Sequence, residues 1–398
     1  MDNTILEKKF DFEFLYLKVI YFLRYFADAM FYSFITVFLV SIGLKEGLIG
    51  NVQSITTITC LIVNPIWSII AKNNKTAKLL LIILSIIEGI VLIIYSNLKT
   101  IELIMIFTSL MAIAASPYYT MLDGHAAAYC ETHKKLYSNI RVAGSIAYMV
   151  GTALGGILIE KIGYTYTFSI AGALFMLVGL MAKFLKNVEK SNKEIETKIS
   201  FKEIFKNKLF IIYAISYLFI VTLSIIGDNY VSLLFVKELG FTVSEYSFVY
   251  SGMIIVEVII MLVSAYVFKN TEPKKLILIA GFAYFMRSLI ISFTGLPVWL
   301  LIFGACLRGV GWGLTLFIHF RYIIQLVGVK NATRAAFVVT VFGSIFNFIV
   351  SNFIGYVFEG IGYDITYKIL SGFVILATII FFVLTNTTSK KIANHETV

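Results

Sequence analysis

The sequence predicts an all-α integral membrane protein in which twelve transmembrane helices form two pseudo-symmetric bundles of six. Three observations predict this fold class. The 398 residues are 59% hydrophobic and 14% charged, whereas soluble domains are about 25% charged. Apolar stretches of about 20 residues, enough to cross a bilayer, follow one another along the whole chain. Short sequence matches also recur between the two halves of the chain.

The expected spans divide into two groups of six around a polar segment. The first group lies near residues 14–41, 48–71, 77–97, 101–128, 137–159 and 164–185. The second lies near 209–236, 244–268, 274–294, 298–326, 333–357 and 365–385. Pro117 is expected to kink the fourth span. The predicted domains are an N-terminal bundle at 1–186, a Lys/Glu-rich cytoplasmic linker at 187–208 and a C-terminal bundle at 209–398.

The basic residues predict the orientation of the chain. With both termini in the cytoplasm, 22 of the 33 Lys and Arg residues lie in cytoplasmic segments, five lie in outer loops, and the other six lie within or at the ends of spans. Cytoplasmic loops normally hold such an excess. We expect a monomeric, multi-pass protein of the cell (inner) membrane with the lipid bilayer around it. The bias accounts for the net charge of +10 without a nucleic-acid partner.

An internal repeat relates the two halves. The segment Glu160–Tyr164, before the sixth span, reads EKIGY, and Glu359–Tyr363, before the twelfth span, reads EGIGY. Gly43 after the first span corresponds in the same way to Gly240 after the seventh. Because these matches fall at equivalent topological positions, they favour two bundles of the same design.

Charged residues inside the predicted spans point to function. A charge at the centre of a bilayer costs roughly 2.5–3.5 kcal/mol on insertion scales and commonly marks a substrate path or a proton relay. Both signs of charge are present, in both halves, which predicts a polar cavity inside a helical bundle and therefore a transporter for a small molecule. The residues are Arg24, Asp28, Asp123, Arg141, Asp228, Glu257, Arg287 and Arg308.

The pairing of these charges leaves alternatives open. Arg24 and Asp28 are four residues apart on one helix and can pair directly, while Asp123 and Arg141 either bridge each other or share a ligand. The four charges of the C-terminal half either neutralise one another in ion pairs or form a proton-coupling device. In the second case Glu257 is the first candidate for a titrating acid. The other candidate coupling residues are Asp228, Arg287 and Asp28. Glu88 in the third span has no obvious partner and is expected near lipid or near the outer end.

Polar and aromatic residues share helix faces with these charges, because positions three, four and seven apart lie on one side of a helix. Tyr119 precedes Asp123 by one turn, Tyr148 follows Arg141 by two turns, and Trp312 follows Arg308 by one turn. Aromatic rings here could stack on a sugar or a base, although packing between helices is the alternative. These residues complete the predicted substrate site: Asp123, Arg141, Tyr148, Tyr119, Glu257, Trp312 and Arg308.

The chain resembles the branch of the major facilitator superfamily that holds lactose permease, the nucleoside–proton symporters and phenylpropionate permease. The clearest likeness is in residues 137–148, YSNIRVAGSIAY, which are similar to the family's Tyr/Phe-Gly-x-x-Arg-x-x-Gly run. The resemblance implies that Asp123 and Arg141 bind ligand hydroxyls or a carboxylate, and that Tyr148 replaces a stacking tryptophan. Glu257 would then link the ligand and proton sites, with Arg287 beside the acid that carries the proton.

Two departures from the family pattern bear on coupling. Arg308 stands in the place of a functional histidine, and Gly311 stands where lactose permease keeps its proton-carrying glutamate. Coupling through that acid cannot operate in this chain. If protons are coupled, the resemblance leaves Glu257, Asp228, Asp123 or Asp28 to carry them.

The sequence as a whole favours a secondary transporter that takes up a sugar, oligosaccharide or nucleoside with protons by alternating access. The alternatives are an organic-anion carrier for an aromatic carboxylate, because Arg287 and Arg308 enrich the C-terminal cavity in positive charge, and an efflux carrier for an amphipathic compound. A membrane-embedded enzyme is the rival from another class. No phosphate loop, metal-ligand cluster or nucleophile motif supports it, so we expect no enzyme activity, cofactor or metal.

Overall fold

The computed structural model describes residues 11–71, 74–186 and 201–396, and every regular element within these ranges is helical. The N-terminal half comprises α1 (Phe12–Tyr32), α2 (Ile35–Ser41), α3 (Glu46–Ile70), α4 (Asn74–Tyr95), α5 (Ile101–Ala115), α6 (Tyr118–Thr132) and α7 (Ser138–Ala182). The C-terminal half comprises α8 (Phe201–Lys206), α9 (Lys208–Tyr217), η1 (Leu218–Thr222), α10 (Leu223–Asp228), α11 (Val231–Leu233), η2 (Leu234–Glu238), α12 (Val243–Val267), α13 (Pro273–Ile291), α14 (Val298–Val327) and α15 (Val329–Glu396).

These elements form twelve spans. Nine helical segments within the described ranges are long and apolar enough to cross a membrane. Two of them, α7 and α15, each contain a non-helical glycine and therefore count as two spans. The remaining span is α13, which carries Lys274 and Lys275 in its first turn and Arg287 in its interior. The fold class predicted from the sequence is confirmed, while the domain boundaries stay a prediction; of the expected linker, residues 187–200 lie outside the described ranges and α8 occupies part of the rest.

Two of the spans are each broken into two helices, one at a proline and the other without a proline. The fourth span breaks at Pro117, between α5 and α6, as predicted from its missing N–H and fixed ring. The first span also breaks, between Tyr32 and Ile35, without any proline. There the Ser33 hydroxyl lies 3.1 Å from the Thr152 hydroxyl of α7, so a tertiary contact accompanies a break that the sequence did not indicate.

The seventh span is irregular around an acidic residue. It runs from α9 through two π-helical segments, η1 and η2, which lie on either side of Asp228 at the end of α10. Such π-turns disturb the regular hydrogen-bond ladder and are frequent at functional sites. This irregular stretch brings Asp228 into the centre of the C-terminal half.

The internal repeat is visible in the backbone. Gly163 inside α7 has φ 82° and ψ 170°, and Gly362 inside α15 has φ 80° and ψ 172°. Gly43 and Gly240 likewise adopt positive φ, 94° and 72°. All four positions were singled out by the sequence matches between the halves. They share a conformation that side-chain-bearing residues avoid, so the two halves turn in the same way at equivalent places.

Gly163→Ala and Gly362→Ala are each expected to lower the free energy of unfolding by about 1–3 kcal/mol, the cost of holding a residue with a Cβ atom in this backbone region. Gly360→Ala is the matched control, because it lies in the same segment with no positive φ and a Cβ atom there would meet nothing within 4 Å. Chemical unfolding of the purified protein in detergent measures the difference. Equal stability of Gly362→Ala and Gly360→Ala would contradict the expectation.

Glycines let the helices of the N-terminal half approach closely. A Cβ atom on Gly151 of α7 would lie 2.6 Å from the carbonyl oxygen of Phe26 in α1, and one on Gly89 of α4 would lie 2.4 Å from the carbonyl oxygen of Gly172 in α7. Small residues at such crossings allow backbone-to-backbone packing inside a membrane. As a result α1 and α4 both pack against α7, and their side chains meet in the centre of this half.

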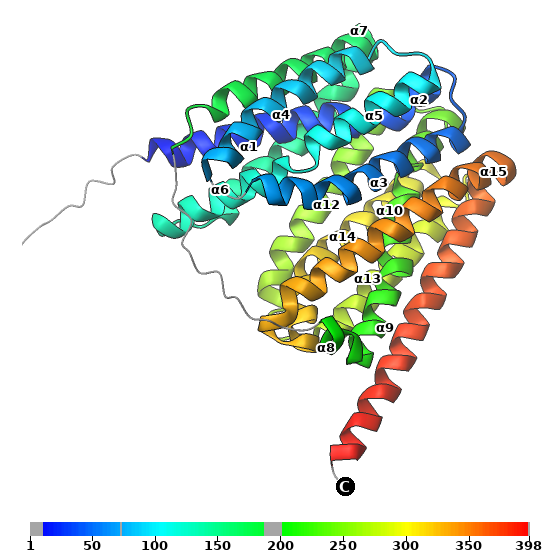
Figure 1. Cartoon of the computed structure of the whole chain (residues 1–398). Coiled ribbons are helices and arrows are strands. Elements are labelled where there is room, and N and C mark those ends of the chain that lie inside the picture. Colours follow the sequence, from blue (N-terminus) through cyan, green and yellow to red (C-terminus); the bar gives the residue numbers. More distant parts are fainter. Residues whose placement is uncertain (1–10, 72–73, 187–200, 397–398) are drawn as a thin grey trace, which may run out of the picture.

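The two halves contact each other mainly at one end. We call this the outer end; it carries the turns at Gly43 and Gly240, and the charge distribution predicts that it faces away from the cytoplasm. Here the beginning of α3 packs against the middle of α15, and α7 packs against the beginning of α12. Gly50 lies against Ser351, and Gly156 lies against Ser247. The first part of α15 runs beside α3 toward this end (Figure 1).

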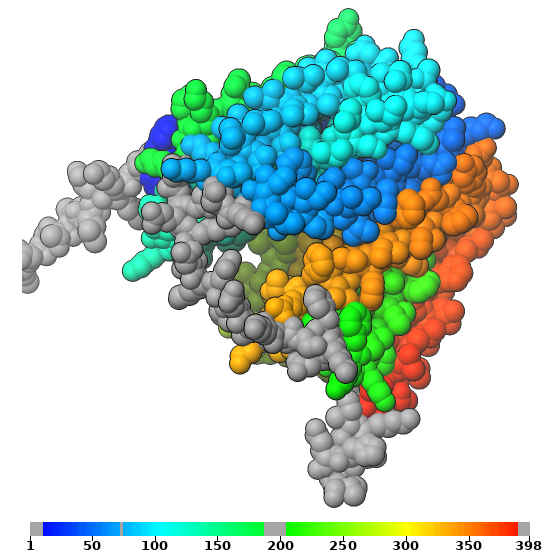
Figure 2. Space-filling view, viewed as in Figure 1, coloured from blue at the N-terminus to red at the C-terminus, as the bar shows by residue number. Residues whose placement is uncertain are grey.

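The same helices present exposed side chains toward the opposite end. On α3 these include Ile66 and Ile69, which are 50% and 63% exposed, and on α15 Phe337, which is 57% exposed. Figure 2 shows a hollow between the blue and cyan surface of the N-terminal half and the yellow and orange surface of the C-terminal half. The molecule is therefore closed at the outer end and parted at the other.

Candidate functional site: two buried charge clusters beside a central cavity

Four helices of the C-terminal half bring two acids and two bases together. Asp228 ends α10, Glu257 lies in α12, Arg287 in α13 and Arg308 in α14. Arg308 donates from Nε to Asp228 Oδ2 at 2.9 Å and from Nη1 to Glu257 Oε2 at 2.9 Å. The second oxygen of Asp228 contacts Arg287. We call these four residues the C-terminal cluster.

The C-terminal cluster is balanced in charge. Each carboxylate is paired with a guanidinium group. Of the two alternatives that the sequence leaves open, the structure therefore has the one in which these charges neutralise one another in ion pairs. The Arg287 side chain is fully buried, whereas those of Arg308, Asp228 and Glu257 are 15%, 16% and 19% exposed. Arg308 also lies over the ring of Tyr250, 5.7 Å from its centroid. The Arg308 side of the cluster thus faces the space between the halves.

The N-terminal half holds a second cluster, Arg24, Asp28 and Glu88, which we call the N-terminal triad. Arg24 and Asp28 pair along α1 as predicted, with Nε and Oδ2 3.2 Å apart. Glu88 of α4 accepts two hydrogen bonds from Arg24, from Nη1 at 2.6 Å and from Nη2 at 2.8 Å. The expectation that Glu88 has no partner and lies near lipid is wrong, because its side chain is fully buried and binds Arg24 through both oxygens.

Aromatic rings enclose the triad. The Arg24 guanidinium lies 4.2 Å from the ring centroids of both Tyr118 and Phe175, which are favourable cation–π positions. The hydroxyl group of Tyr119 donates to Asp28 Oδ2. Tyr119, one of the predicted substrate residues, therefore connects the triad with the half-buried face of α6.

Asp123 and Arg141 do not bridge each other in this structure. Asp123 accepts a hydrogen bond from the Tyr21 hydroxyl at 2.5 Å, and Arg141 lies over the ring of Tyr25, 4.6 Å from its centroid. The rings of Tyr21 and Tyr25 stack, with centroids 6.0 Å apart. The two charges therefore lie against the same aromatic face of α1. Because they form no ion pair with each other here, the alternative that remains is that both bind one ligand.

Residues of both halves meet across the central cavity. Arg141 of α7 is exposed and still lies within electrostatic range of Glu257 in α12. Tyr148 of α7 lies close to Tyr250 in α12 and within the field of Arg308. Trp312, one turn after Arg308 on α14, is half-buried. Arg141 and Tyr148 therefore lie on the side of the N-terminal half that faces the C-terminal half.

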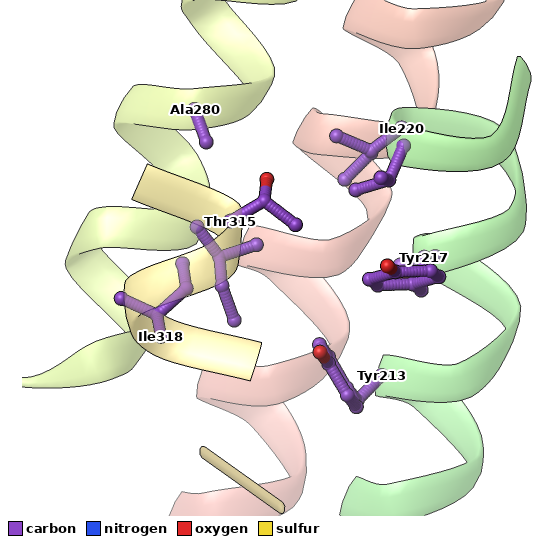
Figure 3. Close-up of a pocket in the computed structure, with 9 residues that line it drawn as sticks. Tyr213, Tyr217, Ile220, Ala280, Thr315 and Ile318 are labelled. Atoms are coloured by element: carbon purple, nitrogen blue, oxygen red, sulfur yellow. The ribbon is translucent and has the colours of Figure 1, made fainter. Parts of the chain in front are cut away.

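A small enclosed cavity lies elsewhere, inside the C-terminal half. Figure 3 shows Tyr213, Tyr217 and Ile220 on one side of it, and Ala280, Thr315 and Ile318 on the other. Its volume of about 10 Å³ is room for about one water molecule. None of the predicted substrate residues lines it. We therefore assign the candidate site to the space between the halves, where the charges are.

Comparison with known proteins identifies the family. The model of the Major Facilitator Superfamily matches residues 17–351. The chain belongs to the Major Facilitator Superfamily. This superfamily consists of transporters and not enzymes, which sets aside the rival enzyme hypothesis. The protein is thus a multi-pass membrane transporter of a small molecule.

Individual relatives in the superfamily are distant. The uncharacterized transporter YwbF of Bacillus subtilis (strain 168) is 22% identical over 280 residues, which cover 70% of this chain and 69% of YwbF. The crystal structure of the nucleoside transporter NupG superposes with a TM-score of 0.82 at 17% identity, covering 94% of this chain and 99% of NupG. A bacterial homologue of the iron transporter ferroportin, in an inward-facing state, gives 0.72 at 12% identity, covering 93% of this chain and 98% of that one. These structures share the fold.

Sequence reasoning missed part of the site. The partner of Glu88 lies 64 residues away on another helix, so sequence spacing does not indicate it, although an acid in the middle of a span is itself a signal. Tyr21, Tyr25 and Tyr250 are not among the predicted site residues, and with 23 tyrosines in the chain the residue type alone does not mark them. The spacing of Tyr21 and Tyr25, four apart on the helix of Arg24, is the signal that could have found them.

Proposed function

We propose that the protein takes up a nucleoside or a sugar, including oligosaccharides, together with protons, by alternating access. One observation carries the proposal: polar and aromatic side chains of both halves face one cavity that is closed at the outer end. Arg141 and Tyr148 come from the N-terminal half, and Glu257 and Arg308 from the C-terminal half. A solute bound to both sides would join the halves.

The chemistry of the lining suits a solute rich in hydroxyl groups. Carboxylates accept hydrogen bonds from hydroxyls and guanidinium groups donate to them. The faces of Tyr148, and of Trp312 on the opposite side, suit a sugar ring or a base. The proposed substrate residues are Asp123, Arg141, Tyr148, Tyr119, Glu257, Trp312 and Arg308. NupG, a nucleoside transporter by name, supports a nucleoside among these solutes through its shared fold.

The proposed orientation places both termini in the cytoplasm, so the cavity in this structure opens inward. The excess of basic residues in the predicted cytoplasmic loops supports it. In the alternate state the contacts at the outer end would separate and the parted ends would meet. Binding at the midplane, between two rocking halves, is how transporters of this architecture expose one site to each side in turn.

A carboxylate substrate is the second candidate, favoured by Arg141. Arg141 is exposed in the cavity and is absent from the ion pairs found within the described residues. Against this candidate, Arg287 and Arg308 are both already paired with acids. An anion would have to compete with Asp228 and Glu257 for them, so the positive field that the sequence suggested is largely cancelled.

The test is ligand-dependent thermal stabilisation, followed by uptake into proteoliposomes, with uridine, lactose and phenylpropionate as probes. A ligand at 100 times its Kd adds about 2.7 kcal/mol to the free energy of unfolding, which is readily measured. We expect uridine or lactose to stabilise the protein and Arg141→Ala to abolish the effect. Glu102→Gln is the control, because Glu102 lies exposed in the first turn of α5.

The outcomes separate the candidates. Stabilisation by uridine or lactose that is weakened less by Arg308→Ala than by Arg141→Ala supports a neutral polar substrate. Stabilisation by phenylpropionate that needs Arg141, Arg287 and Arg308 together would establish the anion carrier instead. Retention of the response in Arg141→Ala would show that the site lies elsewhere, and extrusion of the probes under a pH gradient would point to efflux.

A further inference from the structure

We propose that the proton of the transport cycle is bound by Asp28 in the N-terminal triad, and that the C-terminal cluster does not carry it. This inference rests on the proposed proton-coupled function and deepens it by naming the site. The charges in the sequence favour Glu257 as the first candidate for this acid. The structure supports a different acid through charge balance, burial and hydrogen bonding.

The first argument is the charge of the triad. One guanidinium, that of Arg24, faces two carboxylates, those of Asp28 and Glu88, and the three side chains are 0–3% exposed. Without a proton the triad carries one uncompensated negative charge away from water. An unpaired buried charge is strongly unfavourable, and such groups are instead neutralised by taking up a proton. One proton brings the triad to neutrality.

The C-terminal cluster lacks this imbalance. Asp228 and Glu257 face Arg287 and Arg308, so the cluster is neutral with all four side chains charged. A proton added to Glu257 would leave an excess positive charge there. The N-terminal triad has one cation for two acids, whereas the C-terminal cluster has two cations for two acids. This difference favours the N-terminal triad as the site of the proton.

The hydrogen bonds place the proton on Asp28 and not on Glu88. Both oxygens of Glu88 accept from the two Nη atoms of Arg24, at 2.6 and 2.8 Å; this paired geometry is the strong form of a charge-assisted hydrogen bond and favours the ionised acid. Asp28 holds Arg24 through a single longer bond of 3.2 Å. Its Oδ1 atom is buried and has no hydrogen-bond partner among the described residues. The unpaired oxygen is the open position for the proton.

No other neighbour within the described residues compensates the charge of Asp28. The groups facing it from the packed helices are phenols: Tyr32 on α1, Tyr118 and Tyr119 on α6, and Tyr148 on α7. Arg24 supplies the positive charge felt by Asp28, and Glu88 opposes it. A metal cation in place of the proton would need several oxygen ligands, whereas Asp28 Oδ1 is the single open carboxylate oxygen of the triad.

Tyr119 connects the proposed proton site with the cavity. Its hydroxyl binds Asp28, and its ring packs against Tyr25 with centroids 5.0 Å apart. Tyr25 in turn carries Arg141 on its face. A change in the protonation of Asp28 changes the hydrogen bond that fixes Tyr119, and so changes the aromatic face on which Arg141 rests. Proton and substrate would thereby be coupled within one half.

The test is pH-difference infrared spectroscopy of the full-length protein in liposomes, which detects a protonated carboxyl group and uses the proton itself as the probe. Besides the exposed acids, the wild-type protein should show one buried carboxyl group that titrates separately, with a band absent in Asp28→Asn and present in Glu257→Gln. Glu88→Gln removes one negative charge and balances the triad without a proton. In that variant the Asp28 titration should move at least tenfold toward higher proton concentration. Glu102→Gln is the matched control at an exposed acid.

Each outcome of the infrared measurement either supports or overturns the assignment of the proton to Asp28. Survival of the separately titrating band in Asp28→Asn, loss of that band in Glu257→Gln, or its absence from the wild type would each overturn the proposal. If Asp28→Asn does not fold, the shift in Glu88→Gln decides. No substrate is present in this measurement, so failure of uridine and lactose to be transported would count against the proposed function and leave the proton site standing.

Discussion

Gly355→Leu is expected to prevent closure of the outer end and to hold the transporter open on that side. A Cβ atom on Gly355 would lie 2.2 Å from the carbonyl oxygen of Glu46 and 2.8 Å from the Tyr230 hydroxyl oxygen. The backbone oxygen of α3 cannot move aside alone, so α3 and α15 must separate. Overpacking of this kind costs about 1–3 kcal/mol, enough to shift a two-state equilibrium by roughly 5- to 150-fold.

The labelling rate of a cysteine introduced at Ser54 measures this opening. Ser54 is 1% exposed at the contact between α3 and α15, where its hydroxyl binds the Phe348 carbonyl. In a background with Cys60, Cys130 and Cys306 replaced by serine, a membrane-impermeant maleimide should label Ser54→Cys about tenfold faster or more when Gly355→Leu is added.

Gly372→Leu is the control for this experiment. Gly372 lies in the same helix, α15, and a Cβ atom there would meet nothing within 4 Å. It should leave the labelling rate unchanged. Equal rates for Gly355→Leu and Gly372→Leu would show that the close approach at Gly355 does not control the outer end.

Ion pairs at the outer end are expected to contribute less than the glycine contact. Lys45 pairs with Glu359 at 3.4 Å, but its side chain is 76% exposed, and such pairs contribute about 0–1 kcal/mol. Glu46 is better placed, because its Oε1 atom accepts from Lys237 at 2.5 Å and from Tyr363 at 2.8 Å. Even so, these side chains can rehydrate when the halves separate. The steric fit of backbone on backbone cannot be replaced by water.

The sequence predicted what depends on composition and on single-residue conformational limits. The twelve spans follow from bilayer thickness, the break at Pro117 from a missing N–H, and the repeated turns from glycine. Each of these is a local property that the residue itself determines. The break after Tyr32 and the π-helical segments around Asp228 depend instead on what packs against them, so no local pattern announced them.

The charged residues of the two clusters could be selected from the sequence, whereas most of their pairings could not; their role in a substrate or proton site stays a prediction. The intramembrane cost of charge identifies Arg24, Asp28, Asp228 and Arg308 without any structure. Partners depend on which helices are neighbours. Arg24 and Asp28, on one helix, were paired from spacing, but Glu88 reaches Arg24 from α4 through the close contact of α1 and α4 with α7. Helix adjacency is a tertiary property, and one sequence does not specify it.

Arg24→Leu is expected to be among the most destabilising single substitutions in the chain, because it strands two carboxylates in a buried site. Removing one partner of a buried ion pair costs about 3–5 kcal/mol. The loss should shrink as the pH falls, because protons neutralise Asp28 and Glu88 in the folded variant and replace the missing guanidinium. Unfolding of the purified protein in detergent at two pH values measures both effects. Lys45→Leu, which breaks the exposed pair with Glu359, should cost at most about 1 kcal/mol.

The double variant Arg24→Leu/Glu88→Leu distinguishes two quantities: the net contribution of the Arg24–Glu88 ion pair to the free energy of unfolding, and the cost of removing only one of its partners. Replacing a buried ion pair by apolar residues of similar volume is often neutral or stabilising, and Asp28 keeps its hydrogen bond from Tyr119. The double variant should therefore recover part of the stability lost in Arg24→Leu, and its remaining pH dependence should come from Asp28 alone, whose carboxyl stays buried without a cation. If Arg24→Leu alone is as mild as Lys45→Leu, the triad is hydrated and its charges need no internal balance. A severe single variant rescued by the second change would mean that the pair is kept for function, since stability alone would favour leucine.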